Sequence, residues 1–145
     1  MVGPTRAGLF LCYVLGHDGP SHLTVFRGGA IGASLRHGVG LLAVRHLPAG
    51  WPHGTFAVNL LGSLLMGLLV GWLALKAEGL HQTTRLFLAT GVLGGFTTFS
   101  AFSLEVAEFL RKGETVKAGA YAGLSLLLGV MALFIGLWIA RKVFA

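Results

Sequence analysis

The feature that most constrains this chain is a series of long apolar segments separated by short, charged connections. Residues 54–75 and 118–140 contain no charged side chain, and residues 86–104 contain none either. Each is close to or longer than the roughly 20 residues that an α-helix needs to cross a hydrocarbon core about 30 Å thick. Repeated along one chain, segments of this kind predict membrane-spanning helices.

Four such segments can be delimited, and they set the expected fold. We place the spans at about 23–47, 55–75, 86–110 and 116–140, the first being interrupted by Arg27, Arg36 and His37. Only 11% of the residues are charged, whereas a soluble domain carries about a quarter, so lipid is the expected solvent. We predict an all-α membrane protein with one four-helix transmembrane domain at 23–145.

Residues 1–22 precede the first span, and we expect them to form an extension that is disordered or lies at the membrane interface. Their apolar stretch, "GLFLCYVLG", has only nine residues, too few to cross a bilayer. The chain has one cysteine, Cys12, so no intrachain disulfide is possible.

The basic residues lie at the ends of the spans and in the loops. A net charge of +6 in a soluble protein would suggest nucleic acid, but this distribution favours residues that flank a membrane, and no nucleic-acid partner is expected. Six of the eleven Lys and Arg residues would lie on the side of the N-terminus and five on the other. Two interpretations fit this balance. Copies insert both ways and pair antiparallel, or the rule is uninformative because Arg27 and Arg36 lie within the membrane.

The third segment contains "GVLGGFTTFSAFS" at 91–103, with adjacent glycines at 94 and 95. Glycine weakens a helix by about 1 kcal/mol relative to alanine, so this stretch predicts a helix broken near its centre. A break frees backbone carbonyls, and these oxygens suit a small cation such as Na⁺. The alternative is a glycine-rich crossing point whose threonine hydroxyls bond back to the helix.

Glycines also recur four residues apart, which places both members of a pair on one helix face. Small residues at this spacing let helix backbones approach closely, so we interpret the pairs as packing positions. They are Gly28 and Gly32, Gly67 and Gly71, Gly91 and Gly95, and Gly119 and Gly123.

Three phenylalanines, Phe96, Phe99 and Phe102, follow at a spacing of three. Phe99 and Phe102 share a helix face, and such rings commonly face lipid or pack. The edge of a phenyl ring is electropositive, however, so an anion can lie in the ring plane without a formal positive charge. Ser100 and Ser103 interleave the rings and can donate O–H bonds.

Isolated polar residues mark the other spans. Asn59 lies in the second span and Ser125 in the fourth. An amide in a span is costly unless hydrogen-bonded, so Asn59 either joins helices or offers its two N–H donors to an anion. Arg36, in the first span, either lines a water-filled mouth or extends toward the interface.

No enzyme is expected from this sequence. We find no catalytic triad, phosphate-binding glycine loop or pair of catalytic carboxylates, and the six histidines lack metal-ligand spacing. No acidic residue lies well inside spans one, two or four, and Glu105 lies toward the end of span three.

Four stretches of the sequence resemble the Fluc or CrcB family of bacterial fluoride channels. They are "GGAIGASLRHGVG" (28–40), "GTFAVNLLGS" (54–63), "GGFTTFSAFSLE" (94–105) and "AYAGLSLLLG" (120–129), and they touch all four spans. The combination of Asn59, the Gly-Gly-x-Thr-Thr-Phe-Ser stretch and Phe102 makes the resemblance specific.

The resemblance implies an antiparallel, dual-topology homodimer in the lipid of the bacterial inner membrane, passing fluoride down its gradient. It implies a structural Na⁺ at the dimer centre, held by the backbone carbonyls of Gly94 and Thr97. The fluoride pathway that it implies contains Asn59, Phe99, Phe102, Ser100, Ser125 and Arg36.

Two other functions are considered. A small multidrug-type exporter is another four-span, dual-topology protein, but it requires a membrane-embedded carboxylate, ideally in the first span, and none is there. An accessory membrane subunit without transport activity is the third.

Overall fold

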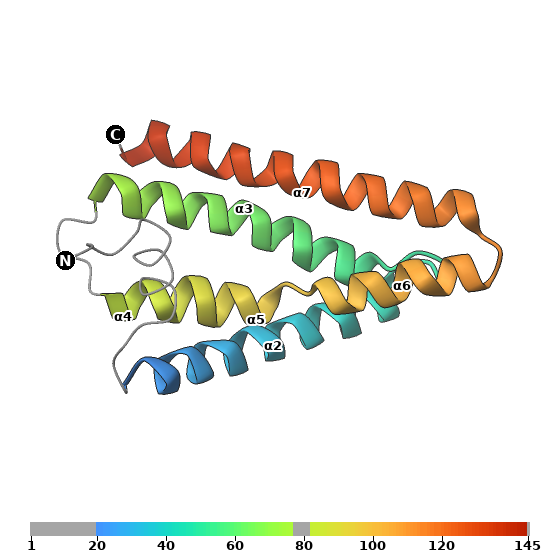
Figure 1. Ribbon diagram of the computed structural model, residues 1–145, viewed down its shortest axis with the longest axis horizontal. Coiled ribbons are helices and arrows are strands. Elements are labelled where there is room, and N and C mark those ends of the chain that lie inside the picture. Colours follow the sequence, from blue (N-terminus) through green and yellow to red (C-terminus); the bar gives the residue numbers. More distant parts are fainter. Residues whose placement is uncertain (1–19, 77–81, 145) are drawn as a thin grey trace, which may run out of the picture.

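The described part of the computed structural model, residues 20–76 and 82–144, is a bundle of long helices. Its elements are α2 (Pro20–His46), α3 (His53–Lys76), α4 (Gln82–Arg85), the π-helix η1 (Leu86–Leu93), α5 (Gly94–Phe96), α6 (Phe99–Arg111) and α7 (Thr115–Phe144). Figure 1 shows them lying side by side along the long axis, with the α2–α3 and α6–α7 connections at one end and the C-terminus at the other. The predicted all-α class is confirmed.

The predicted spans agree well with these helices. Spans 55–75 and 116–140 lie inside α3 and α7, and span 86–110 lies inside the stretch from α4 to α6. Helix α2 covers all but the last residue of 23–47 and already includes residues 20–22. Residues 1–19 lie outside the described part, so the extension predicted for 1–22 stays a prediction.

Three stretches in the described residues are long and apolar enough to cross a membrane: His53–Leu75, Gln82–Arg111 and Thr115–Phe144. Helix α2 is long enough but is not among them, since Arg27, Arg36 and Arg45 lower its hydropathy. The chain is therefore multi-pass in character, and a fourth span in α2 stays a prediction.

Glycines bring helix backbones into direct contact. A Cβ atom added to Gly67 of α3 would lie 2.1 Å from the Leu133 carbonyl oxygen, and one on Gly136 of α7 would lie 2.3 Å from that of Leu64. Helix α2 approaches η1 in the same way, because a Cβ on Gly28 would lie 2.9 Å from Gly91 Cα. No side chain separates the backbones at these points, as expected for small residues at membrane-helix crossings.

The glycine pairs predicted in the first three spans therefore pack against other helices, but the fourth pair does not. A Cβ on Gly119 or on Gly123 would meet nothing within 4 Å in the described residues. The prediction of close packing is wrong for this pair within one copy, because α7 turns that face away from its neighbours.

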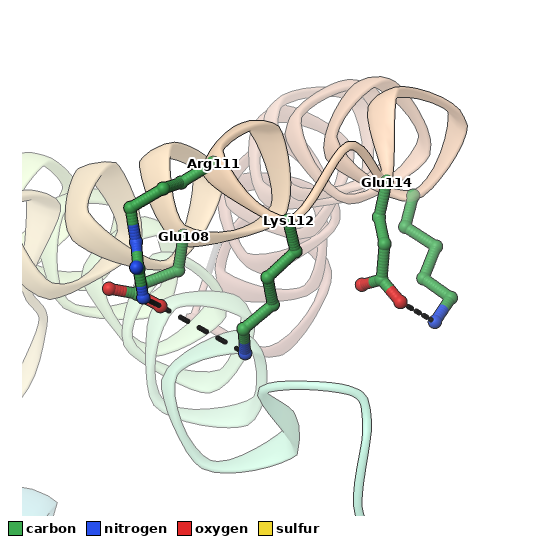
Figure 2. A network of polar contacts seen from close by, with 5 residues as sticks. Glu108, Arg111, Lys112 and Glu114 are labelled. Carbon is green, nitrogen blue, oxygen red and sulfur yellow. Dashed lines mark hydrogen bonds and ion pairs between the residues drawn. The ribbon is translucent and has the colours of Figure 1, made fainter.

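Ion pairs lie at the end of the bundle where α6 turns into α7 (Figure 2). Glu108 pairs with Arg111 at 3.0 Å and with Lys112 at 3.9 Å, and Glu114 pairs with Lys117 at 2.7 Å. All five side chains are substantially exposed, so water and salt screen the pairs and they contribute little to stability. Exposed charges of this kind are typical of an end that lies outside the hydrocarbon core.

Candidate functional site

The third long segment changes backbone conformation at Thr97 and Thr98. Thr97 has φ −83° and ψ 158°, and Thr98 has φ −151° and ψ 118°, so two extended residues separate α5 from α6. The thin connection between these helices is visible in Figure 1. The preceding turns, η1, are π-helical, a winding that is rare and concentrates at functional sites.

The extended residues are not the glycines on which the sequence argument rested. Gly94 has helical angles, φ −64° and ψ −37°. A Cβ on Gly95 would lie 2.6 Å from the Gly29 carbonyl oxygen. The glycines thus serve contact with α2, whereas the β-branched threonines, which fit extended backbone readily, leave the helix.

Asn59 of α3 binds the extended backbone through both ends of its amide. Its Nδ2 donates to the Thr98 carbonyl oxygen at 3.0 Å, and its Oδ1 accepts from the Thr98 amide at 2.8 Å. The Thr98 hydroxyl in turn accepts from the Ala101 amide at 3.2 Å and caps α6. Asn59 therefore joins helices, and one N–H of its NH₂ group is still available to another acceptor.

This bonding leaves two carbonyls without the donors that a continuous helix would provide. The Thr98 amide would bond Gly94 in an unbroken helix, but it bonds Asn59 instead. The Ala101 amide would bond the Thr97 carbonyl, but it bonds the Thr98 hydroxyl. Both carbonyl oxygens are hard ligands of the kind that suit a small cation.

The Thr97 side chain behaves as the alternative interpretation expected. Its hydroxyl donates to the Leu93 carbonyl at 3.1 Å. Its carbonyl oxygen lies 3.5 Å from Arg36 Nη1 of α2, a long contact at the limit of a hydrogen bond. Arg36, which is half-buried, is thus placed beside the extended backbone.

Phe99 and Phe102 form a tilted pair at the start of α6, with centroids 5.7 Å apart. Phe102 also contacts Tyr121, at 5.3 Å between centroids. Phe99 is 79% exposed and Phe96 only 9%. Phe96 therefore belongs to the core, and of the three rings only those of Phe99 and Phe102 line the cavity described next.

A cavity of about 400 Å³ lies between α3, α6 and α7 at this level. Five of the predicted site residues line it, namely Asn59, Thr97, Phe99, Phe102 and Ser125. Three others do not, which are Arg36, Gly94 and Ser100. Ser100 instead lies beside the Thr98 hydroxyl, at 3.2 Å between the two oxygens. Among the described residues, no charged side chain lines the cavity.

Ser125 is buried without a hydrogen bond of good geometry. Its Oγ has no such partner in the described chain, although it interacts with the Tyr121 phenol one turn earlier. A buried hydroxyl without a partner is costly, so this atom is available to a ligand in the cavity.

Sequence reasoning missed a second polar group next to the cavity. Glu105 accepts from the Thr55 hydroxyl at 2.5 Å and from the Tyr121 hydroxyl at 2.6 Å. Tyr121 is fully buried among aromatic rings of Trp51, Phe56, Phe102 and Phe109. The sequence predicts only that Glu105 lies toward the end of the third span, and nothing in it indicates that α3, α6 and α7 meet at this carboxylate.

No group of three or more His, Cys, Asp or Glu side chains that could hold a metal occurs in 20–76 and 82–144.

Comparison with known proteins gives one family. The model of the family described as "CrcB-like protein, Camphor Resistance (CrcB)" matches residues 23–137. A relative from Hyphomonas neptunium, "Fluoride-specific ion channel FluC", is 78% identical over 123 residues, which are 85% of this chain and 97% of the relative. Relatives of the same name from Phenylobacterium zucineum and Caulobacter vibrioides are 53% and 50% identical, each over 85% of this chain and 97% of the relative.

Proposed function

We propose that this chain, which belongs to the CrcB-like protein family, is a fluoride-selective channel that passes the ion down its gradient. The observation that carries the proposal is the cavity, where an amide, hydroxyls and two phenyl rings meet and no charged side chain of the described residues is present. The names of the relatives agree with this chemistry.

The lining suits a small, strongly hydrated anion. Fluoride gives up water only where other donors replace it, and binding must stay weak enough for the ion to leave. The remaining N–H of Asn59 and the hydroxyl of Ser125 are neutral donors, and the ring edges of Phe99 and Phe102 are weakly positive. Neutral groups attract the ion without holding it as a buried arginine would.

We propose that two copies pair antiparallel, because one copy leaves site groups uncovered. Phe99 is 79% exposed, although it lines the cavity, and Gly94 is exposed as well. The near equality of six and five basic residues on the two sides gives no preferred orientation. A second, inverted copy would cover these residues.

The carbonyls of Gly94 and Thr97 fit the structural Na⁺ that we propose for the dimer centre, since neither receives its helical donor. When bound, the cation would supply positive charge to backbone oxygens that lack their helical amide donors in the described part of the chain. In this chain Asn59 and the Thr98 hydroxyl hold the extended backbone open, and they thereby present those oxygens. Replacing sodium with a large organic cation during purification should lower the melting temperature of the dimer.

We place the channel in the bacterial inner membrane, where it would relieve fluoride toxicity. Fluoride enters as neutral HF and is trapped inside as the ion, so a passive pathway driven by the membrane potential is sufficient for export. A strain sensitised to fluoride should regain growth when it expresses this chain.

Ion efflux from liposomes tests the function directly. Purified protein in vesicles loaded with potassium fluoride should release fluoride when a potassium ionophore is added, and chloride should be retained. Absence of fluoride efflux, or equal passage of chloride, would contradict the proposal. The multidrug-type exporter has no support, because the named relatives are fluoride-specific ion channels and α2 contains no carboxylate.

A further inference from the structure

We propose that Ser63 of α3 is a further residue of the fluoride pathway, supplying a hydroxyl to the cavity opposite Gly129 of α7. The inference rests on the proposed function, since it adds a donor to the same cavity. Ser63 would then offer the ion a second hydroxyl, from α3, in addition to that of Ser125 on α7.

The hydroxyl of Ser63 differs from those of Ser34 and Ser103, two other helical serines. Ser34 donates to the Ala30 carbonyl at 2.8 Å and Ser103 to the Phe99 carbonyl at 2.9 Å. This bond to the preceding turn is the usual arrangement for a serine in an apolar helix. Within the described residues Ser63 makes no hydrogen bond, and it lines the cavity.

Ser63 lies on the same helix face as the residue that holds the extended backbone. Asn59 and Ser63 are four residues apart on α3, as are Ser125 and Gly129 on α7, and all four line the cavity. A Cβ atom added to Gly129 would lie 3.7 Å from Ser63 Oγ. The two helices therefore face each other here. Because Gly129 has no side chain, the Ser63 hydroxyl borders open space on the α7 side.

This placement gives the ion successive neutral donors from two helices. An anion beside Asn59 and Ser125 would meet the Ser63 O–H one turn further along α3. Beyond it, the lining is apolar, with Met66, Val130 and Leu133. Ser63 is thus the last neutral donor before the apolar end, and losing it should slow the passage of an ion that must be solvated throughout.

The test compares Ser63→Ala with Ser103→Ala, a control that removes a hydroxyl already bonded to its own helix. Both variants are reconstituted in liposomes, and their fluoride efflux is measured per folded dimer. Efflux through Ser63→Ala should fall about fivefold or more, the loss expected from one hydrogen bond. Ser103→Ala should match the wild type.

A second pair of variants separates the hydroxyl from the shape of the helix. Adding Gly129→Ser to Ser63→Ala returns an O–H from the opposite wall and should restore most of the efflux, whereas Gly129→Ala adds only a methyl group and should not. The open distance at Gly129 allows both side chains.

The outcomes are distinguishable from failure of the proposed function. If wild-type protein passes no fluoride, the channel assignment fails and this inference fails with it. If the wild type passes fluoride and Ser63→Ala passes it equally fast, the channel stands and Ser63 is not part of the pathway. Equal restoration by Gly129→Ser and Gly129→Ala would assign Ser63 to packing and would also overturn the inference.

Discussion

Two neighbouring polar regions, the Glu105 cluster and the cavity, differ in whether their side chains have hydrogen-bond partners. Around Glu105, both carboxylate oxygens receive a hydroxyl, one from Thr55 and one from Tyr121. In the adjoining cavity, the hydroxyls of Ser125 and Ser63 have no protein partner of good geometry in the described chain. The two regions lie within one or two helical turns of each other along α7.

This difference in bonding fits a structural role for the Glu105 cluster and the proposed transport role for the cavity. Buried polar groups that satisfy one another fix the helices in place, since breaking any bond leaves a desolvated partner. Hydroxyls without a protein partner cost free energy on folding, and under the proposed function they are available to the passing ion. Variants that remove one polar group from either region therefore test whether that group supports stability or fluoride efflux.

Asn59 lines the cavity and also holds the extended backbone at Thr98, so its loss should have the largest effect. Asn59→Ala leaves the Thr98 amide and carbonyl unpaired and removes a donor from the cavity. We expect fluoride efflux to fall about a hundredfold, equivalent to about 2.7 kcal/mol, together with a lower melting temperature. Efflux assays and thermal unfolding in detergent measure the two effects. A stable variant with unchanged efflux would remove Asn59 from the site.

Ser125→Ala should affect transport alone. The variant removes a hydroxyl that has no good partner, so stability should be unchanged or slightly higher, while efflux falls about tenfold for one lost bond to an ion. The same two assays apply. A clear loss of stability would show that Ser125 is bonded in the folded protein, and the contrast between the regions would fail there.

Thr55→Val should have the opposite profile. Valine keeps the shape of threonine but leaves one Glu105 oxygen without its donor, which should lower the free energy of unfolding by about 1–2 kcal/mol. Efflux per folded dimer should change less than about twofold, because Thr55 does not line the cavity. A tenfold loss of efflux at normal stability would place the Glu105 group in the pathway.

The smallest effect is expected at the exposed end of the bundle. Lys117→Gln breaks an ion pair with Glu114 that water already screens. Neither the melting temperature nor the efflux should change measurably, at low or at high salt. Sensitivity of efflux to this substitution would indicate that the surface charge draws fluoride toward the cavity.

Much of the architecture follows from the spacing of apolar residues. The helix boundaries of α3 and α7 were predictable because uncharged stretches of this length have few other solutions. The change of conformation in the third segment was anticipated from Gly94 and Gly95, but the residues that become extended are Thr97 and Thr98. Local propensity identified the stretch, and contact with α2 decided which residues stay helical.

The contacts of the site could not be read from the sequence in the same way. Asn59 and Thr98 are 39 residues apart, and nothing local to either residue indicates their pairing. Thr55 and Tyr121 both bind Glu105, and they are 50 and 16 residues from it in the sequence. Ser63 looked like one small residue among many, and only the cavity set it apart.

The direct contact of α3 with α7 has a consequence for discrimination by size. Gly67 and Gly136 bring the two main chains together one to two turns from Ser63, with no rotatable group between them. The distance between the two backbones at this contact therefore cannot change by side-chain rotation. If the proposed pathway continues toward this contact, a larger halide would need the two helices to separate, whereas fluoride would need less separation.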